Sequence, residues 1–422
     1  MRARIKAALD EVQQHLFEEL IPFWLTHGVD EKHGGFLTYL DEHGKPTGET
    51  TKTLVCQTRM VYSAASAHRA KLGEGKFLEI ARQGVDFLIK HFWDEEHTGW
   101  FWTTAGDGTP ENRSKLTYGH SFAIYALSEY AMASGDERGI EMAEETYRCL
   151  TRLAADEENG GFREFMEEDW SPKRPGVYGG DRKSLDVHMH LMEAFTNLYE
   201  ATGAPVYKDD ANYVIGLIFR HMLHPEFGTG IAQFSLDWQA LPAILFRDVW
   251  GSDRDVDEGA RPLDNTSFGH NVEFGWLLKH SVDILDLDLS EFKADMRKLY
   301  DHCVRYGIDW ERGGVYCEGP HNGPARERNK EFWQQAETLV AMLDAYLLFG
   351  DAKYWDAYEN VHRFVMDHVI NHDVGEWLPL LDENNQVMWR YMGHAWKINY
   401  HTVRSMIQSE RRLSILLARG DA

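Results

Sequence analysis

The sequence predicts an all-α protein folded as an (α/α)6 barrel, a closed ring of six helical hairpins. One short motif returns along the chain at nearly constant spacing, which indicates a repeat architecture. The segments between its copies have the apolar period of helices. The last helical segment, 402–417, still carries many apolar residues, whereas an open helical array needs a polar cap at its end. A closed ring is therefore preferred over an open array.

The recurring motif is an acidic residue, a short gap, two glycines or a degenerate pair, and then an alternating apolar stretch. Its copies follow one another about every 60 to 70 residues, with one gap of about 85. The fourth copy is degenerate and the sixth has lost one glycine. The six copies begin at Asp30, Asp94, Asp156, Pro225, Asp309 and His372.

Each repeat is expected to hold two helices of about three or four turns, joined by the glycine turn and short strand-like pieces. Six such pairs give about twelve helices. No Pro- or Ser-rich linker divides the chain, so residues 1–422 are interpreted as one domain. The clearest helical segments are 53–72, 77–92, 118–132, 188–201 and 333–349.

The composition limits the class of partner. A formal charge of -24 argues against nucleic-acid and anionic-membrane partners, which require basic surfaces. No stretch approaches the roughly 20 apolar residues of a membrane span, and the N-terminal segment has no signal-peptide cleavage pattern. The four scattered cysteines are typical of buried free thiols in a reducing compartment. We expect a cytoplasmic monomer or homodimer that binds a small molecule.

One segment, 250–265, breaks the repeat rhythm. It is long, charged and aperiodic, and it immediately precedes His270. Long loops of this kind either cover a functional site or are merely irregular, and both interpretations stay open. The position before His270 favours a lid.

His270 and Glu273 open the next helical segment. They are three residues apart, so they share one face of a helix. A carboxylate beside an imidazole fixes its tautomer and tunes its pKa, which suits a proton-transfer histidine, although such pairs are often only structural. His401, in an aromatic-rich stretch near the C-terminus, is the second candidate histidine.

The pair His188 and His190 suggests a metal site, but residues two apart on a helix point in different directions. The chain has neither an HExxH pattern nor a cysteine-rich zinc pattern, so we expect no metal and no cofactor. His190 is expected to face inward and His188 to pack. Arg59 lies in an apolar helix, where a lone charge is costly unless it serves a polar ligand. Tyr118 opens another helix.

Fourteen tryptophans are present, many at turns or helix starts. Core packing accounts for about half of them, but aromatic faces also stack on the C–H faces of sugars. Together with the histidines, Arg59 and several carboxylates, they favour a carbohydrate-active enzyme.

These motifs together resemble the N-acylglucosamine 2-epimerase superfamily, and within it the branch of cellobiose 2-epimerases and mannose 2-epimerases. The resemblance covers nearly the whole chain. The motifs that carry it are Phe268-Gly269-His270-x-x-Glu273, His188-x-His190-x-x-Glu193-Ala194, Trp333-Gln334-Gln335-Ala336-Glu337, the stretch 122–130, and Trp396-x4-His401 followed by Arg404.

The resemblance implies an (α/α)6 barrel without metal and a reversible inversion at C2 of a reducing-end aldose. It implies that His270 and His401 are the acid/base pair and that Glu273 is the partner of His270. The implied substrate contacts are Arg59, Tyr118, His190, Trp333 and Trp396, to which we add Asp186 and Glu337.

The chain departs from the pattern of cellobiose 2-epimerases at three places. Asp186 stands where those enzymes tend to have Asn, His120 where they have Gln, and the last motif reads Asn399-Tyr400-His401-Thr402 instead of Pro-Tyr-His-Asn. A lid formed by 250–265 would leave less room for a second sugar ring. This favours a monosaccharide such as mannose or glucose.

The chemistry of C2 inversion supports two bases independently. The sugar ring must open, the C2 proton must leave, and a proton must return on the other face, so one histidine on each face is the minimal device. Arg59 is the natural donor to the enediolate oxygen. Three alternatives stay open: an aldose–ketose isomerase giving fructose, a glycoside hydrolase using carboxylates such as Asp186, Glu273 and Glu337, and a non-catalytic sugar-binding protein.

Overall fold

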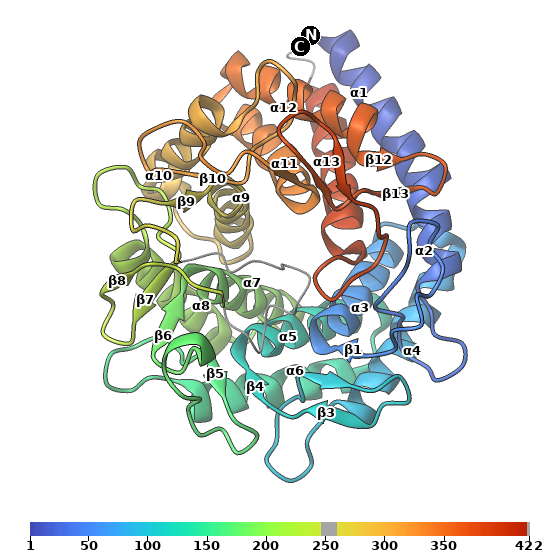
Figure 1. Ribbon diagram of the computed structural model, residues 1–422, viewed down its shortest axis with the longest axis vertical. Helices are drawn as coiled ribbons and strands as arrows, with labels where there is room; N and C mark the ends of the chain where they lie inside the picture. The colour runs from blue at the N-terminus through green and yellow to red at the C-terminus, as the bar shows by residue number, and fades with distance from the viewer. Residues whose placement is uncertain (246–259, 420–422) are drawn as a thin grey trace.

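The computed structural model describes residues 1–245 and 260–419, so most of the proposed lid at 250–265 lies outside the described residues. Within this part of the chain, an inner ring of helices is surrounded by an outer ring (Figure 1). The inner helices are α3 (Leu54–Arg69), α5 (Thr117–Ser134), α7 (Leu185–Thr202), α9 (Phe268–Ile284), α11 (Phe332–Phe349) and α13 (Asn399–Arg419). The outer helices are α1 (Arg2–Gln14), α4 (Lys76–His91), α6 (Glu137–Cys149), α8 (Pro205–Leu217), α10 (Leu289–His302) and α12 (Ala352–Phe364), and α2 (Ile21–His27) extends α1.

The inner ring is closed. Each inner helix contacts the next one in sequence, and α13 contacts both α3 and α1 (Figure 1). The apolar residues of 402–417 are therefore covered by the first helices of the chain. The predicted (α/α)6 barrel and its closure are confirmed.

Short antiparallel strands tie neighbouring repeats together at one end of the barrel, where the inner helices begin. The strand that precedes an inner helix pairs with a strand that follows the next glycine turn, as in β1–β2, β4–β5, β6–β7, β9–β10 and β11–β14. The strands are β1 (Lys52–Thr53), β2 (Thr103–Thr104), β3 (Pro110–Asn112), β4 (Lys115–Leu116), β5 (Phe165–Met166), β6 (Arg182–Ser184), β7 (Gln233–Ser235), β8 (Ala240–Leu241), β9 (Thr266–Ser267), β10 (Glu318–Gly319), β11 (Lys330–Glu331), β12 (Ile370–Asn371), β13 (Glu376–Trp377), β14 (Leu380–Leu381) and β15 (Val387–Trp389).

The recurring acidic residue has a physical role in the fold. In four repeats it accepts a hydrogen bond from a buried lysine that lies two residues before an inner helix. In the degenerate fourth copy, His224 takes the place of the acidic residue and Thr266 takes the place of the lysine. Nδ1 of His224 accepts from the turn amides, and the hydroxyl of Thr266 donates to the carbonyl of Gly230. The four pairs are Asp30–Lys52, Asp94–Lys115, Asp156–Lys183 and Asp309–Lys330, with Nζ–Oδ2 distances of 2.7, 2.7, 2.7 and 2.8 Å.

Breaking one of these pairs should destabilise the fold. Lys183→Met is expected to lower the free energy of unfolding by about 3 kcal/mol, because Asp156 would lose the buried cation that lies 2.7 Å from its carboxylate. Urea denaturation followed by circular dichroism measures this loss. The control is Arg113→Met, which removes an exposed pair with Glu168 and should cost less than about 1 kcal/mol. Equal losses in the two variants would contradict a special role for the buried pairs.

The fourth residue of an inner helix holds the preceding glycine turn. In five repeats this residue accepts a hydrogen bond from a backbone amide that follows the turn. His188 does so through Nε2, 3.2 Å from the amide nitrogen of Phe162. A Cβ on Gly161 would lie 2.9 Å from the same Nε2, so glycine is required there. The five residues are Gln57, His120, His188, Asn271 and Gln335.

Two further expectations concern the cysteines and membrane spans. All four cysteines are free and buried, as predicted. Among the described helices, none combines the length and the apolar character that a membrane crossing requires.

Candidate active site

A cavity lies at the N-terminal ends of the inner helices, inside the ring. It gathers nine of the ten predicted site residues, although they come from positions spread over most of the chain. The tenth, Glu337, lies directly behind His401 and is hydrogen-bonded to it. The nine lining residues are Arg59, Tyr118, Asp186, His190, His270, Glu273, Trp333, Trp396 and His401.

The repeat explains why these residues meet. Because the inner helices begin at the same level of the barrel, equal positions along them form layers across the cavity. The sixth residues form a layer in which all six are less than 4% exposed, yet five of them are ionisable and only Phe122 is not. This layer consists of Arg59, Phe122, His190, Glu273, Glu337 and Arg404.

His401 is held as a neutral base. Its Nδ1 lies 2.6 Å from Oε1 of Glu337. Burial opposes ionisation of Glu337, but the charge of Arg404 and the bond from His401 lower the pKa of that carboxyl to about 2. Burial lowers the pKa of His401 to about 3 despite the carboxylate. Since an ionised carboxylate only accepts, Nδ1 carries the proton and Nε2 has a free lone pair.

His190 has the opposite character. Its Nδ1 lies 2.9 Å from Oε2 of Glu193, and its Nε2 lies 3.4 Å from Oδ1 of Asp186. Burial disfavours the imidazolium, but the two carboxylates outweigh it and raise the pKa of His190 to about 9. His190 is therefore a cation that donates from Nδ1 to Glu193 and forms an ion pair through Nε2 with Asp186, which suits binding and not proton abstraction. The expectation that His190 faces inward while His188 packs agrees with these contacts.

The surroundings of His270 differ from the expected pair with Glu273. The carboxylate near its Nε2 is Asp186, with Oδ1 at 3.6 Å, while Oε1 of Glu273 accepts from Arg404 at 3.0 Å. His270 is the third residue of α9 and 31% exposed, whereas Glu273 lies one turn deeper, level with Arg404 and Glu337. Burial and the nearby Glu337 raise the pKa of Glu273 to about 8, so it stays protonated at neutral pH.

Arg59 is a buried cation that aromatic rings accommodate. Its guanidinium lies 4.4 Å from the ring centre of Phe122 and 4.8 Å from that of Tyr400. Its Nη2 donates to the hydroxyl of Tyr118 at 2.9 Å. A cation of this kind at the cavity wall can stabilise a negatively charged oxygen of a bound ligand.

Aromatic rings form much of the cavity wall. The ring of Trp333 lies 4.8 Å from that of His270 and 5.8 Å from that of His401, so the two histidines flank one indole. Trp396 lies 5.9 Å from the ring of Tyr118. Flat apolar walls between ionisable groups match the two faces of a pyranose or of an opened sugar chain.

Sequence reasoning did not assign a role to several residues of this site. Glu193 and Arg404 were noticed only as parts of motifs, yet they lie behind His190 and His401. Each follows its histidine by three residues, a spacing that could have indicated both. Other lining residues, from loops and short strands, carried no periodic signal: Arg261, Glu318, Glu327, Asn329, Trp389 and Tyr391.

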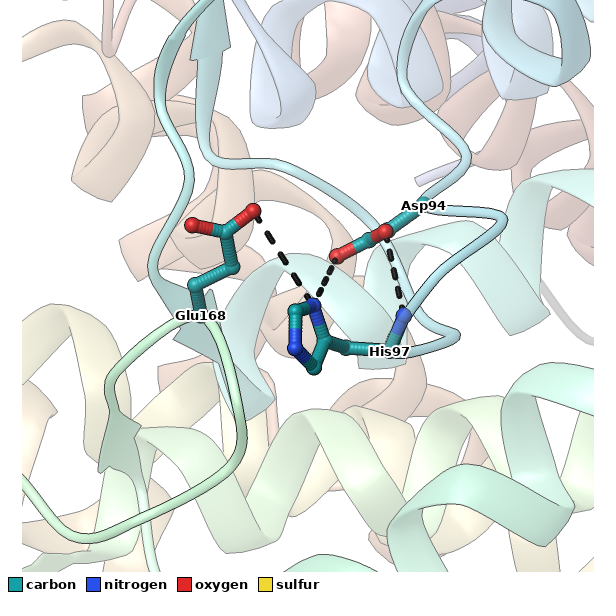
Figure 2. Close-up of side chains that lie close together, drawn as sticks. All are labelled: Asp94, His97 and Glu168. Atoms are coloured by element: carbon teal, nitrogen blue, oxygen red, sulfur yellow. Dashed lines mark hydrogen bonds and ion pairs between the residues drawn. The ribbon is translucent and has the colours of Figure 1, made fainter.

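Among residues 1–245 and 260–419, two groups of carboxylates and histidine could in principle hold a metal ion. In the first, Nδ1 of His97 faces Asp94 at 3.5 Å and Glu168 at 4.0 Å (Figure 2). Lys115 already donates a hydrogen bond to Asp94 at 2.7 Å, and Arg113 donates one to Glu168 at 2.6 Å. The first repeat contains the same turn, with His33 3.5 Å from Asp30, so the arrangement belongs to the fold.

The second group, Glu273, Glu337 and His401, lies in the candidate site itself. Arg404 donates to both carboxylates and supplies the positive charge that a metal ion would bring. We therefore expect activity to persist after exhaustive EDTA treatment, measured by product chromatography. A loss of activity that zinc or manganese restores would contradict this expectation.

Comparison with known proteins adds an independent finding. The sequence model of the N-acylglucosamine 2-epimerase family matches residues 34–405. A cellobiose 2-epimerase of Dictyoglomus turgidum is 26% identical over 97% of this chain and 100% of its own. A D-mannose isomerase of Marinomonas mediterranea is 25% identical over 94% and 96%. The solved structure of a cellobiose 2-epimerase from Spirochaeta thermophila superposes with a TM-score of 0.85, at 30% identity and 99% coverage of both chains.

Proposed function

The chain belongs to the N-acylglucosamine 2-epimerase family, and on this premise we propose that it is a sugar 2-epimerase that inverts C2 of a reducing-end aldose. The observation that carries the proposal is the placement of His270 and His401, which line one cavity and flank the ring of Trp333. Two proton-transfer groups around one binding position fit an inversion, which needs a base on each face of C2.

The proposed reaction starts from the open-chain sugar. His401 accepts the C2 proton through Nε2, and Arg59 donates to the oxygen of the enediolate that forms. His270, beside the carboxylate of Asp186, returns a proton to the other face. The reverse reaction exchanges the two roles. Tyr118, His190, Trp333 and Trp396 position the sugar.

The substrate unit is proposed to be D-glucose or D-mannose. One relative is named for cellobiose, whose reducing end is glucose, and another for D-mannose, which differs from glucose only at C2. The free monosaccharides are the preferred form on the sequence argument given above, in which a lid at 250–265 leaves less room for a second sugar ring; most of that segment lies outside the described residues. We also propose that the enzyme works in the cytoplasm.

Isomerisation of mannose to fructose is the second candidate, and the D-mannose isomerase relative favours it. It uses the same enediolate but returns the proton to C1, which one histidine can do. A glycoside hydrolase is less consistent with the site. Glu337 accepts from His401, Arg404 and Trp276, so its carboxylate is not available as a catalytic acid.

Incubation with D-mannose, D-glucose, cellobiose and lactose, followed by chromatography of all products, tests the proposal. Interconversion of glucose and mannose is the expected result. Fructose as the main product would favour the isomerase, and release of monosaccharides from the disaccharides would favour a hydrolase. No conversion of any of the four sugars would contradict the proposed function.

A further inference from the structure

The guanidinium of Arg404 is shared by three carboxylates. Its Nη1 lies 2.7 Å from Oε1 of Glu193, and its Nη2 lies 2.7 Å from Oε1 of Glu337 and 3.0 Å from Oε1 of Glu273. The side chain is 1% exposed, and its flat face lies over the ring of Trp276 at 4.8 Å. Three carboxylates from α7, α9 and α11 thus converge on one cation from α13.

Two of these carboxylates hold site histidines. Glu337 accepts from Nδ1 of His401 at 2.6 Å, and Glu193 accepts from Nδ1 of His190 at 2.9 Å. Arg404 therefore contacts the carboxylate partners of two histidines, of which His401 is neutral and His190 is charged. It lies beneath the cavity lining, where it reaches the two histidines through their partners and contacts Glu273 directly.

We propose that Arg404 is a positioning residue that holds His401 as a neutral, correctly oriented base and keeps His190 and Glu273 in register with it. The proposal rests on the proposed function for its catalytic consequence. Its structural part is independent of the substrate, because it concerns only which nitrogen of His401 carries the proton.

The charge of Arg404 has a defined effect on His401. Burial lowers the pKa of His401 most, Glu337 raises it, and the buried cations Arg59 and Arg404 lower it further because they disfavour a third cation nearby. Without it, the carboxylate of Glu337 would face His401 without its cation, and the pKa of His401 should rise. The base would then take up a proton at higher pH and accept the C2 proton less readily.

A matched control exists on the same helix. Arg412, two turns further along α13, also makes a two-pronged pair, with Nε and Nη2 both 2.7 Å from the oxygens of Asp344. It also lies near Trp276, at 5.9 Å, but it contacts neither Glu193 nor Glu337. Arg412→Lys therefore reproduces the loss of a guanidinium fork without touching the histidine partners.

The experiment compares Arg404→Lys and Arg404→Met with Arg412→Lys, using the full chain. Arg404→Lys keeps the charge but loses the fork, and it should lower kcat by about 10- to 100-fold with KM changed less than threefold. Arg404→Met should lower kcat further and shift the acidic limb of kcat/KM to higher pH. Added guanidinium at millimolar concentration should partly restore Arg404→Met, since it can occupy the vacated position.

A second measurement does not depend on activity. In protein labelled with ¹⁵N-histidine, His401 should show one protonated and one bare nitrogen at pH 7, with the signal assigned by its loss in His401→Asn. The pH at which the bare nitrogen takes up a proton should be higher in Arg404→Met than in the wild-type protein and unchanged in Arg412→Lys. This readout holds even if the wild-type protein converts none of the sugars tested, so failure of the function and failure of the proposal are distinguishable.

Folded Arg404 variants that keep the wild-type kcat, pH profile and histidine signals would overturn the proposal. So would an Arg412→Lys variant with the same kinetic changes, because both effects would then be structural. If Arg404→Met does not fold, Arg404→Lys decides the question through the ratio of its kcat to that of Arg412→Lys.

Discussion

Replacing His401 with Asn is expected to lower the rate of C2 epimerisation by more than about 10⁴-fold, beyond the usual loss of one acid–base group. Asn keeps a side chain that can hydrogen-bond to Glu337 but offers no titrating nitrogen. The position is 6% exposed, so no solvent path replaces the lost base. Coupled enzymatic assays of glucose and mannose measure the loss.

The same reaction in D2O identifies the step. The wild-type enzyme should place deuterium at C2 of the product, because the histidine that returns the proton draws it from solvent. His401→Asn and His270→Asn should both fail to invert C2. One of them can still exchange the C2 proton of one epimer without inversion, since half of the relay survives. NMR spectroscopy of the sugar separates exchange from inversion.

His188→Gln is the matched control for both variants. His188 is also buried, but it accepts a hydrogen bond from the backbone amide of Phe162. Gln57 and Gln335 accept the equivalent hydrogen bond in other repeats. The glutamine variant should therefore retain most of the wild-type rate. A His401→Asn or His270→Asn enzyme that interconverts the epimers at near the wild-type rate would remove the basis of the assignment.

The repeat made the fold predictable from the sequence. The acidic residue recurs because it is the buried partner of Lys52 or of an equivalent lysine. The glycines recur because the turn needs a backbone with positive φ at positions such as Gly161. The helical period alone also predicted that His190 and His188 point in different directions. These features are local, so a single chain displays them as spacing.

The partners of the site histidines were less predictable, because they depend on which helices are neighbours. Asp186 reaches His270 from α7 to α9, and Glu337 reaches His401 from α11 to α13. Along one helix, the spacing of three was used to pair His270 with Glu273, which the structure does not pair, and it was not used for His190 and Glu193, which the structure does pair. The difference is depth, since Glu273 is drawn to the cation of Arg404 from another helix.

Glu337→Gln should lower kcat by about 10²–10⁴-fold while KM changes little, because Glu337 stabilises the imidazolium that forms when His401 takes the proton. The amide is isosteric but uncharged. Oε1 of Glu337 accepts from His401 and Arg404, and Oε2 accepts from Trp276 at 2.7 Å. All three partners donate, so either orientation of the amide sets one donor against another. In serine proteases the corresponding change, Asp to Asn behind the catalytic histidine, costs about 10⁴-fold.

The pH dependence separates a loss of charge from a loss of orientation. The Glu337 carboxylate raises the pKa of His401, against the larger lowering by burial. Removing the carboxylate therefore lowers the pKa of His401 further, and Glu337→Gln should be slow without a new acidic limb between pH 5 and 8. Arg404→Met should change the profile in the opposite direction. Trp276→Phe removes only the donor to Oε2 and should cost less than about tenfold. A Glu337→Gln enzyme as active as Trp276→Phe would show that the charge behind His401 contributes nothing to proton transfer.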